Sequence, residues 1–155
     1  MSGTHRAQTI LLLADGFDEA GVGVILSRLR QEGLAVSLVG LRANRVYGAH
    51  GLVIVPDKSL DRLLEATAPI SALILPGGSN HLVRLRLDPR VGVLLKRCVE
   101  EQAILVGLDW QMEDMTSIGA ELGDGLSWLR PEPGQPLDRF VTTLIRRLRE
   151  IEQEG

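Results

Sequence analysis

Residues 72–78 read ALILPGG, four apolar residues that end at a proline and two glycines. Comparable short, mostly apolar runs lie at residues 10–13, 35–39 and 103–108, and each is followed within two residues by Gly, Pro or Asp. Continuous short runs of this kind are typical of strands that are buried on both faces of a parallel sheet. The sequence therefore predicts four buried strands.

Longer amphipathic stretches separate these runs. Residues 22–30 carry their apolar side chains on one helical face, and Gly33 follows as a typical residue beyond a helix end. Asp88-Pro89 combines an N-cap residue with a proline at the first helical position. Further helices are expected over residues 60–66 and 137–152. The alternation predicts an α/β layer fold with right-handed crossovers.

One segment interrupts the alternation. Residues 45–55 read RVYGAHGLVIV, in which Gly48 and Gly51 can supply the turn of a small hairpin. We expect this hairpin to be inserted between two helical units.

Composition limits the class of protein. The chain has 155 residues, 45% of them hydrophobic, which suits one domain over residues 1–155. A net charge of -3 and 3% aromatic residues argue against a nucleic-acid partner, because such proteins usually present basic patches and stacking side chains. No apolar run approaches the roughly 20 residues of a membrane span, and the first residues lack a signal peptide. We therefore expect a cytoplasmic protein with no membrane partner, in which the lone Cys98 forms no internal disulfide.

Polar and glycine residues follow three of the predicted strands. In an open parallel sheet, ligands bind beyond the carboxyl ends of the strands. Residues 14–19 (ADGFDE), 76–80 (PGGSN) and 108–110 (LDW) occupy these positions. The expected ligand-binding residues are Asp15, Gly77, Gly78, Ser79, Asp109 and Trp110. The three histidines, His5, His50 and His81, show no metal-ligand spacing, so we expect no metal and no cofactor.

These segments, in this order, resemble the ThiJ/PfpI family of the class I glutamine amidotransferase-like superfamily. The resemblance rests on LLADGFDE at residues 12–19, GLVIVPD at 51–57 and LILPGG at 73–78. DKSL at 57–60 and the glycine- and proline-rich residues 124–134 extend it over most of the chain. It implies a flavodoxin-like three-layer sandwich with a mostly parallel sheet, a small inserted hairpin and a homodimer.

The resemblance also implies a catalytic site that this sequence departs from. Family members carry a cysteine at the elbow after the fourth long strand, a Glu after the first strand and often a His beyond the elbow. Here the elbow position falls on Asp109, the Glu position falls on Gly21 with Glu19 two residues earlier, and no histidine follows His81. The strands that usually lie between the elbow helix and the final strand are expected to be missing. We therefore expect a non-catalytic member that binds a partner protein or a small ligand.

Several interpretations of Asp109 remain open at this point. It can cap the helix that begins at Trp110, contact a ligand, form an aspartyl ester, or imitate an oxidised cysteine, since a sulfinate and a carboxylate share charge and shape. Likewise Asp15, Asp18 and Glu19 form either an acidic pocket with Asp109 or a loop that caps the following helix.

The remaining candidates have simpler explanations. Cys98 lies on the apolar face of a predicted helix and is expected to be a small buried hydrophobic residue. Trp110 and Trp128 would mark an interface if they were exposed. The alternative function is a divergent hydrolase or a glyoxalase- or deglycase-like enzyme that uses Asp109 or Glu19 as its base. A receiver-like phosphoacceptor site is disfavoured, because Pro76-Gly77-Gly78 follows the middle strand where an aspartate would be needed.

Overall fold

A parallel sheet forms the centre of the computed structural model, which describes residues 6–108, 117–119, 122 and 126–154. Its strand order is β5-β2-β1-β6-β7-β8, and every neighbouring pair is parallel. The strands are β1 Gln8–Leu13, β2 Val36–Gly40, β5 Lys58–Ser59, β6 Ile70–Leu75, β7 Ile104–Gly107 and β8 Trp128–Leu129. The four apolar runs therefore form β1, β2, β6 and β7, as predicted.

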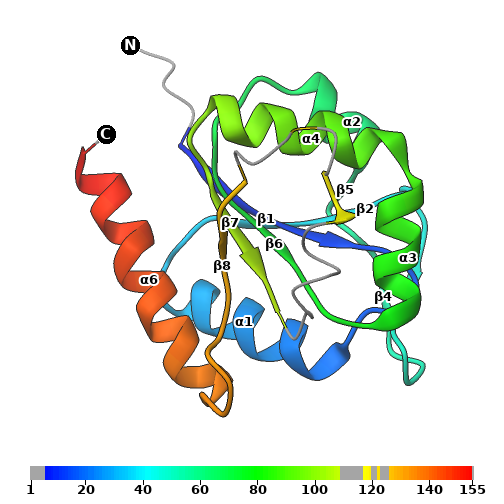
Figure 1. Ribbon diagram of the computed structural model, residues 1–155, viewed down its shortest axis with the longest axis horizontal. Coiled ribbons are helices and arrows are strands. Elements are labelled where there is room, and N and C mark those ends of the chain that lie inside the picture. Colours follow the sequence, from blue (N-terminus) through cyan, green and yellow to red (C-terminus); the bar gives the residue numbers. More distant parts are fainter. Residues whose placement is uncertain (1–5, 109–116, 120–121, 123–125, 155) are drawn as a thin grey trace.

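Helices cover both faces of this sheet. They are α1 Glu19–Gln31, α2 Leu60–Glu65, α3 Ser79–Leu87, α4 Pro89–Glu100 and α6 Leu137–Glu154. One hydrophobic cluster joins the sheet to α2, α3 and α4, and a second joins it to α1 and α6. Figure 1 shows α2 and α4 on one side of the strands and α1 on the other. The predicted three-layer α/β sandwich is confirmed.

The helix boundaries follow from local capping. Asp18 caps α1 through a bond from the Gly21 N–H, and Ser59 caps α2 through a bond from the Arg62 N–H, both at 3.3 Å. Asp88 accepts from the Arg90 N–H at 2.9 Å, with Pro89 in the first turn of α4. The predicted Asp88-Pro89 start is thus correct.

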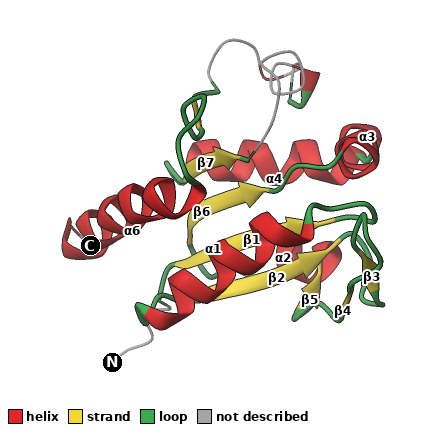
Figure 2. Ribbon diagram, turned by 90° about the horizontal axis from the view of Figure 1, so that it is seen from below, coloured by secondary structure: helices red, strands yellow, loops and turns green. Residues whose placement is uncertain are grey.

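The predicted hairpin is present at the edge of the molecule. Its strands are β3 Val46–Tyr47 and β4 Val53–Ile54, paired antiparallel, and Figure 2 shows them near β5 at the same end of the sheet as α3. Val46 is buried in the α1–α6 core cluster, whereas Tyr47 and its cross-strand partner Val53 are exposed. The hairpin therefore has one packed face and one free apolar face.

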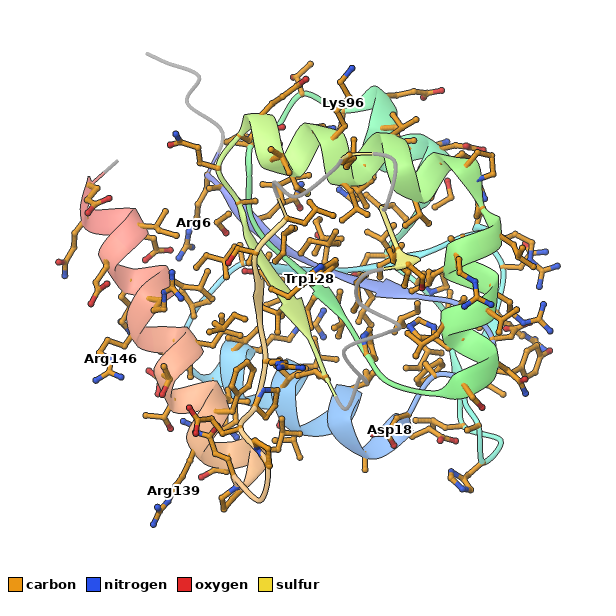
Figure 3. The ribbon with its side chains drawn as sticks, viewed as in Figure 1. Arg6, Asp18, Lys96, Trp128, Arg139 and Arg146 are labelled. Carbon is orange, nitrogen blue, oxygen red and sulfur yellow. The ribbon has the colours of Figure 1, made fainter. Side chains whose placement is uncertain are left out.

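The predicted C-terminal helix is present as α6. Its residues Phe140, Leu144, Ile145 and Leu148 are buried against the sheet. Arg139 and Arg146 project from its outer side, as Figure 3 shows. No described helix is both long and apolar enough to cross a membrane.

One helix of the structure was not predicted from the sequence, and one predicted segment lies outside the described residues. Helix α3, over Ser79–Leu87, was not expected, because its apolar residues are interrupted by His81 and two arginines. The helix expected after Asp109 and most of the glycine-rich residues 119–125 lie outside the described residues.

Arg97 connects α4 to the loop between α2 and β6. Its guanidinium donates to the carbonyl oxygens of Leu63 and Ala68 at 3.0 and 2.7 Å, and to the Glu101 carboxylate at 2.7 Å. Glu101 in turn accepts from the Ile70 N–H at 3.0 Å. The Arg97 side chain is only 18% exposed. If it were truncated, water would poorly replace the hydrogen bonds that it donates to these acceptors.

We therefore expect Arg97→Ala to lower the free energy of unfolding by about 1–3 kcal/mol, because partly buried carbonyl groups lose their donors. Urea denaturation measures the change. Lys96→Ala is the matched control, since Lys96 is the exposed neighbour on the same helix and should change stability by no more than about 0.5 kcal/mol. Equal stability of the two variants would show that the Arg97 network contributes nothing.

Candidate functional site

Two glycines bring the ends of β1 and β6 into contact. Gly78 has a φ of +117°, and a Cβ atom placed on it would lie 2.2 Å from the carbonyl oxygen of Gly16. The Asp18 N–H donates to the Gly77 carbonyl at 3.0 Å across the same junction. Any side chain at position 78 would clash with backbone, so the fold itself requires this glycine.

The Pro-Gly-Gly turn leaves backbone donors at the carboxyl edge of the sheet. Within the described residues, the N–H groups of Gly77 and Gly78 donate to no carbonyl or carboxylate. Ser79 and Asn80 are exposed in the first turn of α3, and no side chain caps this helix at Gly78. These groups stand at the edge of the sheet where the sequence places a ligand.

The acidic residues after β1 have separate partners. Asp18 caps α1. Asp15 accepts from the Tyr47 N–H at 3.0 Å and from Arg42 at 3.3 Å, so it belongs to the base of the hairpin. The capping interpretation is thus correct for Asp18, whose position at the start of α1 is labelled in Figure 3.

Glu19 holds the hairpin turn. Its carboxylate accepts from the N–H groups of His50 and Leu52 at 2.7 and 3.2 Å and lies 3.2 Å from the His50 Nδ1. A Cβ atom on Gly48 would lie 2.4 Å from Glu19, so a glycine is needed for this approach. Burial tends to raise the pKa of Glu19, but the bonds from Leu52 and His50 outweigh it and lower that pKa overall. Glu19 is therefore an ionised structural anchor.

Gly21 faces the end of β7. A Cβ atom there would lie 3.1 Å from the Asp18 carboxylate and 3.9 Å from the side chain of Leu108. Leu108 continues the sheet, because its N–H donates to the Leu75 carbonyl at 3.1 Å. A glutamate at position 21 would thus point toward the carboxyl end of β7, whereas this chain has only a hydrogen atom there. Asp109 and Trp110 lie outside the described residues.

The thiol of Cys98, the single cysteine, is unreactive in this position. Cys98 lies on α4, is fully buried and packs in the core cluster with its helix neighbours Leu94 and Leu95. Burial raises the pKa of this thiol to about 12. A thiolate is the nucleophilic form of cysteine, so Cys98 is the buried hydrophobic residue that the sequence predicts.

His81 is hydrogen-bonded to the backbone at the junction between the ends of β1 and β6. It is fully buried, and its Nδ1 accepts the Ala14 N–H at 3.0 Å. Burial lowers the pKa of His81 to about 4, although the carbonyl groups of Ala14 and Pro76, which can accept from the protonated ring, oppose that shift. No motif or spacing in the sequence indicated this role of His81. In the described part of the chain, no group of His, Cys, Asp and Glu side chains could hold a metal ion.

Comparison with known proteins agrees with this geometry. The DJ-1/PfpI family matches residues 7–107, from the start of β1 to the end of β7. The chain belongs to the DJ-1/PfpI family. The match ends two residues before Asp109, the position where the resemblance places the family's cysteine.

A curated relative named as a deglycase, from Thermococcus kodakarensis, is 27% identical over 94 residues, which are 61% of this chain and 55% of the relative. The chain thus aligns with little more than half of that relative.

Solved structures of the DJ-1 superfamily share the fold. A Salmonella typhimurium member, solved as a cysteine-to-alanine mutant, has a TM-score of 0.74 at 21% identity, with 96% of this chain and 97% of that chain covered. Oxidised DJ-1 from Toxoplasma gondii has a TM-score of 0.76 at 15% identity, covering 96% and 94%. Drosophila melanogaster DJ-1beta has a TM-score of 0.74 at 18% identity, covering 92% and 91%. These likenesses establish the fold.

We expect the stability of this protein to fall as the pH decreases from about 6.5 toward 4. The unfolded His81 takes up a proton near its ordinary pKa of 6.5, whereas the folded residue does so only near 4, so the unfolded state binds more protons between these values. The full effect amounts to about 3 kcal/mol, which urea denaturation across this pH range measures.

His81→Phe removes the titrating group and should remove this part of the pH dependence, although it also costs the bond to Ala14. Lys96→Ala is the control, because Lys96 is an exposed residue on a different helix, α4, and it should keep the wild-type profile. A His81→Phe profile as steep as that of the wild type would contradict the assignment.

Proposed function

We propose that this chain is a non-catalytic member of the DJ-1/PfpI family that binds a partner protein or a small ligand at the carboxyl edge of its sheet, with Asp109 in place of the family's nucleophilic cysteine. The observation that carries the proposal is the position of the only sulfur nucleophile. Cys98 is buried in α4 with a raised pKa, and β7 ends without a cysteine.

The other catalytic groups support the same conclusion. Gly21 provides no carboxylate toward the end of β7, and Glu19 uses its carboxylate oxygens to hold the hairpin. The lowered pKa of Glu19 makes it a weak base, since a general base works best with a pKa near the working pH. His81 is neutral, buried and bonded to Ala14. A cytoplasmic location is part of this proposal and is supported by the unpaired, buried cysteine.

A divergent glyoxalase- or deglycase-like enzyme or hydrolase is the alternative. The curated relative named as a deglycase favours it, although the chain covers only 55% of that relative. Such an enzyme would need Asp109 or Glu19 as its base or nucleophile. The contacts of Glu19 leave Asp109 as the better of these two candidates.

We expect no turnover of methylglyoxal, a nitrophenyl ester or a peptide above the rate of a buffer blank, because the chain lacks an accessible thiolate. Initial rates of the purified full chain and of Asp109→Asn are measured side by side. A rate above the blank that disappears in Asp109→Asn would replace this proposal with the enzymatic alternative. Ligand binding that Asp109→Ala leaves unchanged would remove Asp109 from the site.

We also propose that the chain forms a homodimer through the free face of its hairpin. Tyr47, Val53 and Val55 share that face, and Val55 is 68% exposed. The carboxylates of Glu19 and Asp15 accept hydrogen bonds from the hairpin backbone. These bonds hold the exposed apolar face of the hairpin in a fixed position. A two-fold contact would bury the same patch of both chains and remove its apolar side chains from water.

For this interface we expect Val53→Asp/Val55→Asp to convert a dimer to a monomer, because a two-fold axis brings four carboxylates into an apolar contact. Size-exclusion chromatography with light scattering gives the mass. Val93→Asp is the matched control, since Val93 is an exposed valine on α4, distant in sequence from the hairpin. A wild-type monomer, or a double variant that remains dimeric, would refute the interface.

A further inference from the structure

An open cavity lies beside the loop that follows β1. It has a volume of about 620 Å³ and is lined by the end of β1, by the segment between β2 and β3, and by the junction of α3 and α4. Leu13 and Ala14 contribute to one wall, and Asp88 and Pro89 to another. Its size is in the range of sites for small molecules.

This cavity is separate from the edge at Gly21 and Leu108. The β1–β6 junction divides the two regions, because Asp15 before it turns to Arg42 and Tyr47 while Asp18 after it turns to Gly21. Asp15 lines the cavity, and Gly77 and Gly78 do not. A ligand here would not need Asp109, so this inference can fail or succeed independently of the function proposed above.

Positive charge dominates the lining of this cavity. Four arginines line it, Arg42, Arg45, Arg84 and Arg90, against two carboxylates. Both carboxylates already accept hydrogen bonds from neighbouring residues of the chain. Asp88 accepts from Arg90 at 2.7 and 2.9–3.0 Å, and those bonds lower its pKa. Asp15 accepts from Tyr47 and Arg42.

Arg45 and Arg84 therefore carry the uncompensated charge. Both are exposed, and neither pairs with a carboxylate within the described residues. Arg45 lines the cavity from the base of the hairpin and Arg84 lines it from α3. Figure 2 shows the hairpin and α3 at the same end of the sheet. Guanidinium groups bind phosphate and carboxylate oxygens in a bidentate manner.

Apolar side chains line the rest of the cavity. Leu13 and Val46 are buried in its wall, and Leu41 is half-buried beside them. Leu87, at the end of α3, is 74% exposed, a large apolar side chain with little to cover it. An organic group lying against Leu41 and Leu87 would cover this apolar surface.

We propose that this cavity binds a small organic phosphate monoester. The phosphate lies between Arg45 and Arg84, whose two charges match a dianion, and the organic group lies against Leu41 and Leu87. Arg42 and Arg90 shape the site while their charges are balanced by Asp15 and by Asp88 and Asp61.

The test uses phenyl phosphate as the probe, with inorganic phosphate, benzoate and phenol as comparison compounds. Titration calorimetry at low salt with the full chain should show phenyl phosphate binding more tightly than the other three. Arg45→Gln/Arg84→Gln should weaken this binding by about tenfold or more, because two charge-assisted contacts are lost. Arg86→Gln is the matched control, since Arg86 is exposed on the same helix and does not line the cavity.

Each result decides a part of the proposal. Leu87→Asn should weaken phenyl phosphate binding and leave inorganic phosphate binding unchanged, because only the organic group contacts Leu87. Benzoate binding as tightly as phenyl phosphate would refute the choice of a phosphate. No heat at millimolar phenyl phosphate, or equal binding by Arg45→Gln/Arg84→Gln and the wild type, would overturn the site. Unchanged urea midpoints in these surface variants would show that the losses are not caused by unfolding.

Discussion

The contact between Gly16 and Gly78 is the constraint on which the rest of this carboxyl edge depends. The two loops approach so closely that a Cβ atom on Gly78 would lie 2.2 Å from the Gly16 carbonyl oxygen. This approach allows the Asp18 N–H to reach Gly77 and places His81 under Ala14. It also determines which acidic residue faces which side: Asp15 faces the arginine-lined cavity, and Asp18 faces α1. One backbone junction thus creates two separate regions along the same edge.

Much of the fold could be predicted because its signals are local. Continuous apolar runs predicted β1, β2, β6 and β7, and the capping pair Asp88-Pro89 predicted the start of α4. Helix α3 gave no comparable signal, since its buried face consists of His81, Leu82 and Leu85 only and ends at an exposed Leu87. A narrow stripe interrupted by arginines does not show the wide apolar face of an amphipathic helix.

The candidate site was harder to predict because its contacts are non-local. Glu19 anchors residues His50 and Leu52, more than thirty positions away, and it does so only because Gly48 has no side chain. The arginines of the cavity come from three segments that no motif connects, so only the folded chain brings them together. By contrast, the burial of Cys98 followed from helical periodicity alone, because its partners Leu94 and Leu95 are near in sequence.

The Pro-Gly-Gly turn shows why a family motif and a family activity are different claims. The sequence predicts a ligand-binding role for this turn, yet the structure requires Gly78 for a steric reason that involves no ligand. A chain that lost its elbow cysteine would still need this glycine to join β1 to β6, since any side chain there would displace the Gly16 carbonyl. Retention of the turn therefore reports on the fold. Activity depends on groups that the fold does not need, so the function proposed for this chain rests on the glycine at position 21 and the aspartate at position 109 and not on the turn.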